Sequence, residues 1–74
     1  MNVVGPRVRQ ARLTSGLTQS GLAARLQVRG LKIDRAGVAK IEGRLRQVSD
    51  SELLALAAAL EVSPAWLLDV DTAK

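Results

Sequence analysis

The chain has 74 residues, of which 47% are hydrophobic, enough for one compact domain with a modest core and too few for a second domain. It contains no cysteine and no histidine, which excludes disulfide bonds, Cys/His zinc sites, thiol nucleophiles and histidine general bases. Its formal net charge is +4.

The first predicted helix covers residues 6–15. It begins at Pro6, where the first helical turn has no need of a backbone N–H, and we expect Gly5 to cap it. Its apolar positions follow helical spacing and predict one buried face. They are Val4, Val8 and Ala11.

The other four predicted helices share one start signal. Each has a small polar N-cap, an apolar residue before it, and a second apolar residue four positions into the helix. The cap oxygen accepts a hydrogen bond from a free backbone N–H while the two apolar side chains pack together. Ser49 and Glu52 also complete a capping box. The triplets Leu17/Thr18/Leu22, Ile33/Asp34/Val38, Val48/Ser49/Leu53 and Val62/Ser63/Leu67 predict helices over 19–28, 35–42, 50–60 and 64–68.

These helices carry short apolar stripes and must therefore pack against one another, and no strand pattern competes with them. The predicted fold class is all-α with five helices. Trp66, the only aromatic residue, is expected to close one end of the core. The further stripe positions are Leu22, Ala23 and Leu26, then Val38 and Ile41, then Leu53, Leu56, Ala57 and Leu60.

The basic side chains are concentrated in the first two thirds of the chain. Residues 1–48 carry ten basic and two acidic side chains, a net charge of +8, whereas residues 49–74 carry one basic and five acidic, a net charge of −4. This asymmetry suits a polyanion, because contacts to phosphates release counterions and supply most of the nonspecific affinity. Alternatively, the arginines only solvate helix faces.

Several short runs mark the middle and the end of the chain. They are Gly16-Leu17-Thr18-Gln19, Leu22-Ala23, Val38-Ala39-Lys40-Ile41-Glu42, Leu56-Ala57-Ala58-Ala59-Leu60-Glu61-Val62-Ser63 and Trp66-Leu67-Leu68. In this order and spacing the chain resembles the Cro/C1-type (XRE) helix-turn-helix family of phage and bacterial repressors from Val8 to Leu68. The resemblance implies a five-helix, lambda-repressor-like DNA-binding domain whose second and third helices form the helix-turn-helix.

The resemblance also implies roles for individual residues near the second helix. Thr18 caps that helix, and Gln19 occupies the position from which the family's glutamine contacts a phosphate, so both are expected at the DNA backbone. The alternative for Gln19 is a solvated amide. Arg12 and Glu42 match a family pair that forms a structural salt bridge, so Arg12 is not counted as a DNA contact.

Base reading is expected from the outward face of the third helix, since Val38 and Ile41 face the core. An arginine early in a reading helix can bond guanine O6 and N7, and a phosphate contact is the alternative. An alanine there can pack on a thymine methyl, and a lysine can reach a base or the backbone. The predicted readers are Arg35, Ala36, Ala39 and Lys40.

The segments flanking the third helix depart from a simple pattern. The connection 27–33 is longer than most family members have, with Gly30 as a left-handed helix stop and Leu31 and Ile33 tucked into the core. Gly37 interrupts the helix and permits a close approach to DNA or to the second helix, or reflects drift at an exposed site. Gly43 allows a turn after the helix. Backbone phosphate contacts are expected from Arg29, Lys32, Arg44 and Arg46.

The sequence thus predicts a cytoplasmic, sequence-specific regulator of transcription that binds double-stranded DNA, acting as a repressor through its third helix. An antitoxin-like protein-interaction module is the alternative. The seven carboxylates form no recognisable catalytic site, and no cofactor or metal is expected. We expect one domain over 1–74, with its core over 6–68, a flexible tail over 69–74 and no membrane segment. A homodimer patch of Leu54, Ala55, Ala58 and Leu68 is left open.

Overall fold

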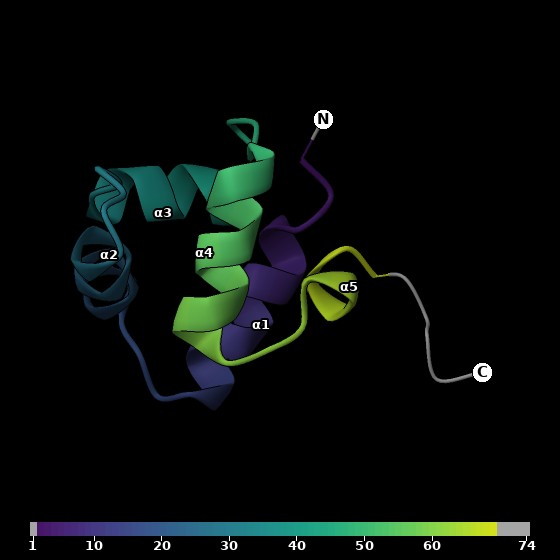
Figure 1. Cartoon of the computed structure of the whole chain (residues 1–74), viewed down its shortest axis with the longest axis horizontal. Coiled ribbons are helices and arrows are strands. Elements are labelled where there is room, and N and C mark those ends of the chain that lie inside the picture. The colour runs from purple at the N-terminus through teal and green to yellow at the C-terminus, as the bar shows by residue number, and fades with distance from the viewer. Residues whose placement is uncertain (1, 70–74) are drawn as a thin grey trace.

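The computed structural model describes residues 2–69 of the chain, and within that range the regular structure is entirely helical (Figure 1). The all-α, five-helix prediction is confirmed. The middle three helices have their predicted bounds, the first is shifted by one residue toward the N-terminus at both ends, and the last ends one residue earlier than predicted. The expected tail lies outside the described residues, apart from Asp69. The helices are α1 (Gly5–Thr14), α2 (Gln19–Val28), α3 (Arg35–Glu42), α4 (Asp50–Leu60) and α5 (Pro64–Leu67).

Four of the five helices begin with the predicted cap chemistry. The side-chain oxygens of Thr18, Asp34, Ser49 and Ser63 each accept a hydrogen bond from the backbone N–H three residues later, at 2.8–3.2 Å. The capping box of Ser49 is closed by Glu52, whose carboxylate accepts the Ser49 backbone N–H at 3.0 Å. Cap bonds of this kind stabilise a helix by about 1 kcal/mol each.

The predicted cap of α1 is wrong. Gly5 is the first helical residue, and the N-cap position belongs to Val4, whose side chain has no polar atom to offer. The free amides of Val4 and Gly5 donate instead to Oδ1 of Asn2, at 2.9 and 3.0 Å. The capping oxygen therefore comes from a residue further back along the chain than a standard N-cap.

The core lies among all five helices. Figure 1 shows α4 in the centre, with α2 on one side, α5 on the other and α1 beside it. The helices α2 and α3 pack on each other, and α3 also packs on α1. None of the helices in residues 2–69 is long and apolar enough to cross a membrane. The buried apolar side chains are Val4, Val8, Ala11, Leu22, Ala23, Leu26, Ile33, Val38, Ile41, Leu56, Ala57, Ala59, Leu60 and Leu67.

Three side chains expected in the core lie at its edge. Leu31, Leu53 and Trp66 are half-buried and pack against the core cluster. The Arg7 guanidinium carbon lies 4.6 Å from the Trp66 ring centroid, in a cation–π contact. Arg7 also pairs with Asp69, so it links α1 to the end of α5.

The connection between α2 and α3 covers residues 29–34 and has the expected helix stop. Gly30 has φ +89°, and the Leu31 N–H donates back to the Leu26 carbonyl at 3.1 Å. At Gly37 a Cβ would lie 2.9 Å from Cγ2 of Ile33, so the close approach that the structure shows is to Ile33. The glycine makes room for the apolar residue that precedes the cap of its own helix.

Candidate nucleic-acid interface

The helix α3 presents its predicted reading residues on the side away from the core. On the opposite side of the same helix, Val38 and Ile41 are completely buried. Arg35 is the first residue of the helix, directly after the Asp34 cap, so its side chain projects from the N-terminal turn. Of the four predicted readers, Arg35, Ala36 and Lys40 are exposed and Ala39 is half-buried.

The C-terminal end of α3 is tied to α1 by a buried ion pair. Arg12 Nε donates to Glu42 Oε2 at 2.6 Å and Arg12 Nη2 donates to Oε1 at 3.1 Å, a bidentate arrangement. Only 9% and 4% of the two side chains are exposed. Hydrogen bonding to Glu42 raises the pKa of the Arg12 guanidinium above its ordinary value. Arg12 Nη1 also donates to the Leu17 carbonyl at 2.9 Å, so one side chain links α1, the entry to α2 and the end of α3.

Gln19, a predicted phosphate contact, has a partner within the protein. Its Nε2 donates to Glu42 Oε1 at 3.2 Å, which the sequence did not indicate. Gln19 is half-buried, and Thr18 before it is exposed at the start of α2. The backbone N–H groups of this helix start and the remaining amide hydrogen of Gln19 are the donors available to an anion.

Arg44 is exposed in a strained backbone conformation. Its φ is +61°, in the left-handed region that glycine usually occupies. The Arg44 N–H donates to the Ile41 carbonyl and the Leu45 N–H to the Lys40 carbonyl, at 3.1 and 2.7 Å, which ends α3 with a tight turn. The turn holds Arg44 at the end of α3, with its side chain free in solvent.

Arg46, a predicted phosphate contact, forms an ion pair within the protein. Its Nη2 donates to Glu52 Oε2 at 2.9 Å, and its Nη1 is buried without a hydrogen-bond partner among the described residues. Burial disfavours the ionised form of Glu52, but hydrogen bonds from Ser49 and Arg46 outweigh it, so the Glu52 pKa is lowered. Arg46 and Glu52 together fix the loop between α3 and α4.

The lowered pKa of Glu52 predicts a pH dependence of stability. Because the folded-state pKa lies below the unfolded value, ionised Glu52 stabilises the fold above about pH 4.5, and this contribution is lost as the pH falls through the folded pKa. Chemical denaturation of Glu52→Gln should show lower stability than the parent at pH 7 and a difference that shrinks below pH ~4.5. A difference constant down to pH ~3 would contradict this assignment.

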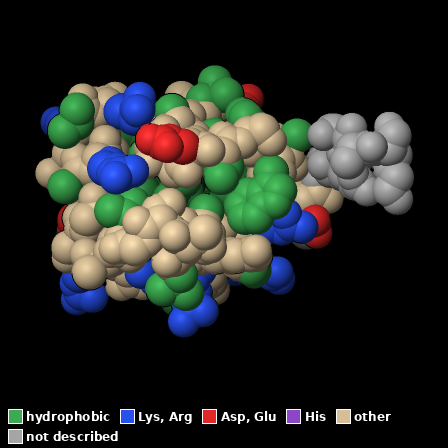
Figure 2. Space-filling model, turned by 90° about the horizontal axis from the view of Figure 1, so that it is seen from below, with side chains coloured by type: hydrophobic (Ala, Val, Ile, Leu, Met, Phe, Trp, Pro, Cys, Tyr) green, Lys and Arg blue, Asp and Glu red, His purple; other side chains and the backbone are tan. Residues whose placement is uncertain are grey.

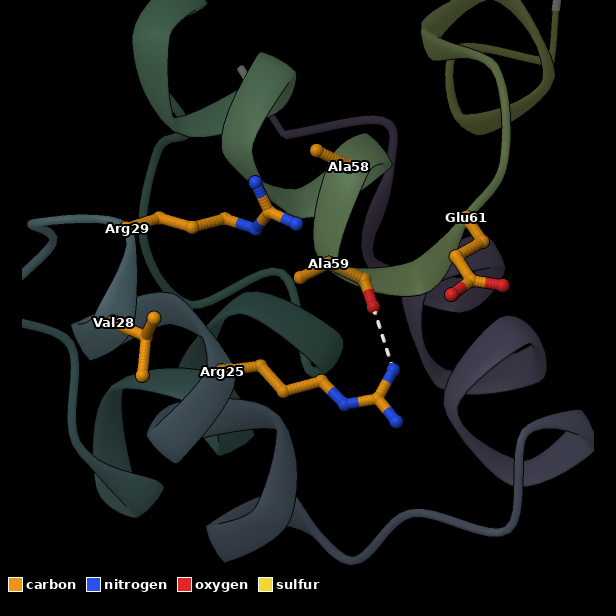
Figure 3. Close-up of a pocket in the computed structure, with 6 residues that line it drawn as sticks. All are labelled: Arg25, Val28, Arg29, Ala58, Ala59 and Glu61. Carbon is orange, nitrogen blue, oxygen red and sulfur yellow. Dashed lines mark hydrogen bonds between the residues drawn. The ribbon is translucent and has the colours of Figure 1, made fainter.

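Arg29 lies in a groove between α2 and α4 (Figure 3). Arg25 and Arg29 both extend from α2 toward α4, and Arg25 Nη1 donates to the Ala59 carbonyl at 2.9 Å. Arg25 thereby caps the C-terminal end of α4, a role that sequence reasoning missed. Lys32 is exposed in the turn just before α3.

The positive charge is distributed around the molecule. Figure 2 shows Lys and Arg side chains at the left end and along the lower edge of the face seen from below, with hydrophobic side chains between them. Exposed cations also lie at both ends of α3, at Arg35 and Arg44. A polyanion lying along α3 would therefore meet positive charge at both ends of that helix.

Two capped helices joined by a turn, with the second helix exposed and flanked by cations, define a helix-turn-helix DNA-binding domain. The helix-turn-helix family model matches residues 8–67. The chain belongs to this family, of the Cro/C1 (XRE) type, and is a DNA-binding transcriptional regulator.

Two solved structures share the fold. The P22 c2 repressor protein, crystallised with synthetic operator 9T, has a TM-score of 0.79 and 25% identity over 96% of this chain and 100% of its own. The restriction-modification controller protein C.AhdI from Aeromonas hydrophila has a TM-score of 0.75 and 39% identity over 86% of this chain and 89% of its own. No curated protein matches the chain in sequence.

Proposed function

We propose that the protein represses transcription by inserting α3 into the major groove of an operator. The observation that carries this proposal is the exposed face of α3, whose N-terminal residue Arg35 stands free while the opposite face is buried. An α-helix fits the major groove, and an arginine there can donate two hydrogen bonds to guanine. The P22 c2 repressor, with the same fold, is bound to an operator, which supports the same use here.

In this arrangement the readers are Arg35, Ala36, Ala39 and Lys40, and the phosphate contacts come from both sides of α3. The start of α2, with Thr18 and Gln19, meets one stretch of backbone through its free N–H groups. Lys32 and Arg44 extend the contact before and after α3. We leave out Arg29 and Arg46, because Arg29 lies in the α2–α4 groove and Arg46 pairs with Glu52.

We further propose that two copies bind the operator as a symmetric dimer, on half-sites about one helical turn apart. The exposed apolar side chains of α4 and of the residue that follows α5 support this. Leu54 is 60% exposed and Leu68 39% exposed, and Ala58 lies one turn along α4 from Leu54. Ala55, which follows Leu54, is half-buried.

Because Arg44 has a strained backbone, we expect its replacement by glycine to raise the stability of the protein and to weaken its binding to DNA. Arg44→Gly removes a left-handed strain of about 1 kcal/mol and should raise the melting temperature. It also removes a phosphate contact, so the slope of log affinity against log salt concentration should fall by about one.

Glu61 provides the matched control for Arg44, because its φ is +59° at the end of α4. Glu61→Gly should be stabilised in the same way, with DNA binding unchanged. Calorimetry and binding titrations at several salt concentrations measure both quantities. An Arg44→Gly protein with the parent's affinity and salt slope would remove Arg44 from the interface.

The proposed function is tested by selection from pooled random duplex DNA at two salt concentrations, followed by sequencing of the retained DNA. We expect binding that weakens strongly with salt and an enriched motif. Absence of binding at low salt would overturn DNA recognition and favour a protein-interaction module. Retention without enrichment would overturn sequence specificity.

A further inference from the structure

The chain before α1 folds back onto the C-terminal end of α3. Asn2 is only 8% exposed, and its Nδ2 donates to the backbone carbonyls of Ile41 at 2.8 Å and Arg46 at 3.0 Å. Its Oδ1 accepts the amides of Val4 and Gly5. Both amide hydrogens and both oxygen lone pairs are therefore used, so the carboxamide is held in one orientation.

Gly5 gives an independent sign that the two helix ends are in close contact. A Cβ at Gly5 would lie 2.5 Å from the Ile41 carbonyl oxygen and 2.8 Å from that of Glu42, so no larger residue fits without movement of the backbone. The N-terminal end of α1 thus abuts the C-terminal end of α3. These ends carry partial charges of opposite sign, which favours the contact.

The backbone atoms that Asn2 holds belong to the segment that the proposed function uses. Ile41 follows Lys40 in the last turn of α3, and Arg46 lies two residues after Arg44 in the loop. The Arg12–Glu42 ion pair fixes the side-chain face of the same helix end. It makes no contact with the Arg46 carbonyl, which is held by Asn2.

We propose that Asn2 is a positioning residue for DNA binding. Through its two carbonyl contacts it orients the end of α3 and the loop of residues 43–49, called here the Arg44 loop. This inference rests on the proposed function. We place no DNA contact on Asn2 itself. It fixes the positions of Lys40 and Arg44 in the free protein, so that these two residues need little rearrangement to contact DNA.

The Asn2 carboxamide makes two sets of hydrogen bonds, one from Nδ2 to the two carbonyls and one from the α1 amides to Oδ1. Two substitutions distinguish the two sets. Asn2→Asp keeps an oxygen that accepts the α1 amides but places a second oxygen against the carbonyls of Ile41 and Arg46, which repels them. Asn2→Ala removes both sets of hydrogen bonds. Ser63→Ala is the control, because it removes the N-cap bond of a different helix, α5, which packs on α1 and α4.

The three variants are compared with the parent at a temperature where circular dichroism shows each one folded. We expect Asn2→Asp to bind the selected operator about tenfold more weakly, with a lower salt slope, because the lost hydrogen bonds free the loop. Ser63→Ala should bind as the parent does. In the free proteins, amide hydrogen exchange of Arg44 and Leu45 should be faster in Asn2→Asp and unchanged in Ser63→Ala.

Folded Asn2→Asp with the parent's affinity, salt slope and exchange rates would overturn the proposal and leave Asn2 a purely structural cap. If Asn2→Asp does not fold, the same comparison is made with Asn2→Ala. If the parent itself binds no duplex, the proposed function fails. The exchange rates of the free proteins then still decide whether Asn2 holds the Arg44 loop.

Discussion

Glu42→Ala is expected to destabilise the protein by about 3 kcal/mol, because it leaves the Arg12 guanidinium buried without its counter-charge. For a domain of this size that corresponds to a fall in melting temperature of roughly 15 °C. The loss is larger than that of a surface ion pair because both side chains are shielded from water. Gln19 loses its hydrogen-bond partner in the same variant.

A double-mutant cycle isolates this pair. Arg12→Met and Glu42→Met should each be strongly destabilised, whereas the double variant should recover much of the loss, because two apolar side chains of similar length leave no buried charge. Urea denaturation of the four proteins gives the coupling free energy. Single variants within about 0.5 kcal/mol of the parent would show that the ion pair does not hold α3 on α1.

Arg35→Ala is expected to have the largest effect on sequence recognition. Loss of a bidentate contact to guanine should cost about 1 to 3 kcal/mol of discrimination at one base pair of each half-site. The motif enriched from random duplex should therefore become degenerate at that position and remain defined elsewhere. The fold should be unaffected, because Arg35 is exposed and the Asp34 cap is retained.

Arg44→Ala is the matched comparison for Arg35→Ala. Both substitutions remove an exposed arginine at an end of α3, but Arg44 is proposed to contact phosphate alone. Arg44→Ala should weaken all sequences alike and lower the salt slope by about one, with the motif unchanged. If both variants change the motif in the same way, the two ends of α3 have not been assigned correctly.

The helices after α1 could be predicted from sequence because their start signals are local. Thr18, Asp34, Ser49 and Ser63 each cap an amide three residues away, so neighbouring residues contain the whole signal. The spacing of apolar residues then shows which side of each helix is buried. The fold follows from these two kinds of local information together with the family resemblance.

The remaining details depend on contacts between distant parts of the chain. Asn2 meets partners 39 and 44 residues away, and no local pattern marks it as a cap for α1. Arg29 lines a groove together with residues of α4, which sequence spacing alone does not place beside it. The bond between Gln19 and Glu42 likewise arises only when α2 and α3 are packed.

The central claim, that α3 reads the major groove, is tested most directly by changing the base atom that Arg35 is proposed to contact. Guanine N7 lies in the major groove, and 7-deazaguanine removes it without altering base pairing. Binding of the parent and Arg35→Ala is measured on the selected operator with and without this change. We expect the modified base to weaken the parent about tenfold and to leave Arg35→Ala nearly unaffected. Equal losses for both proteins would contradict contact between Arg35 and the base.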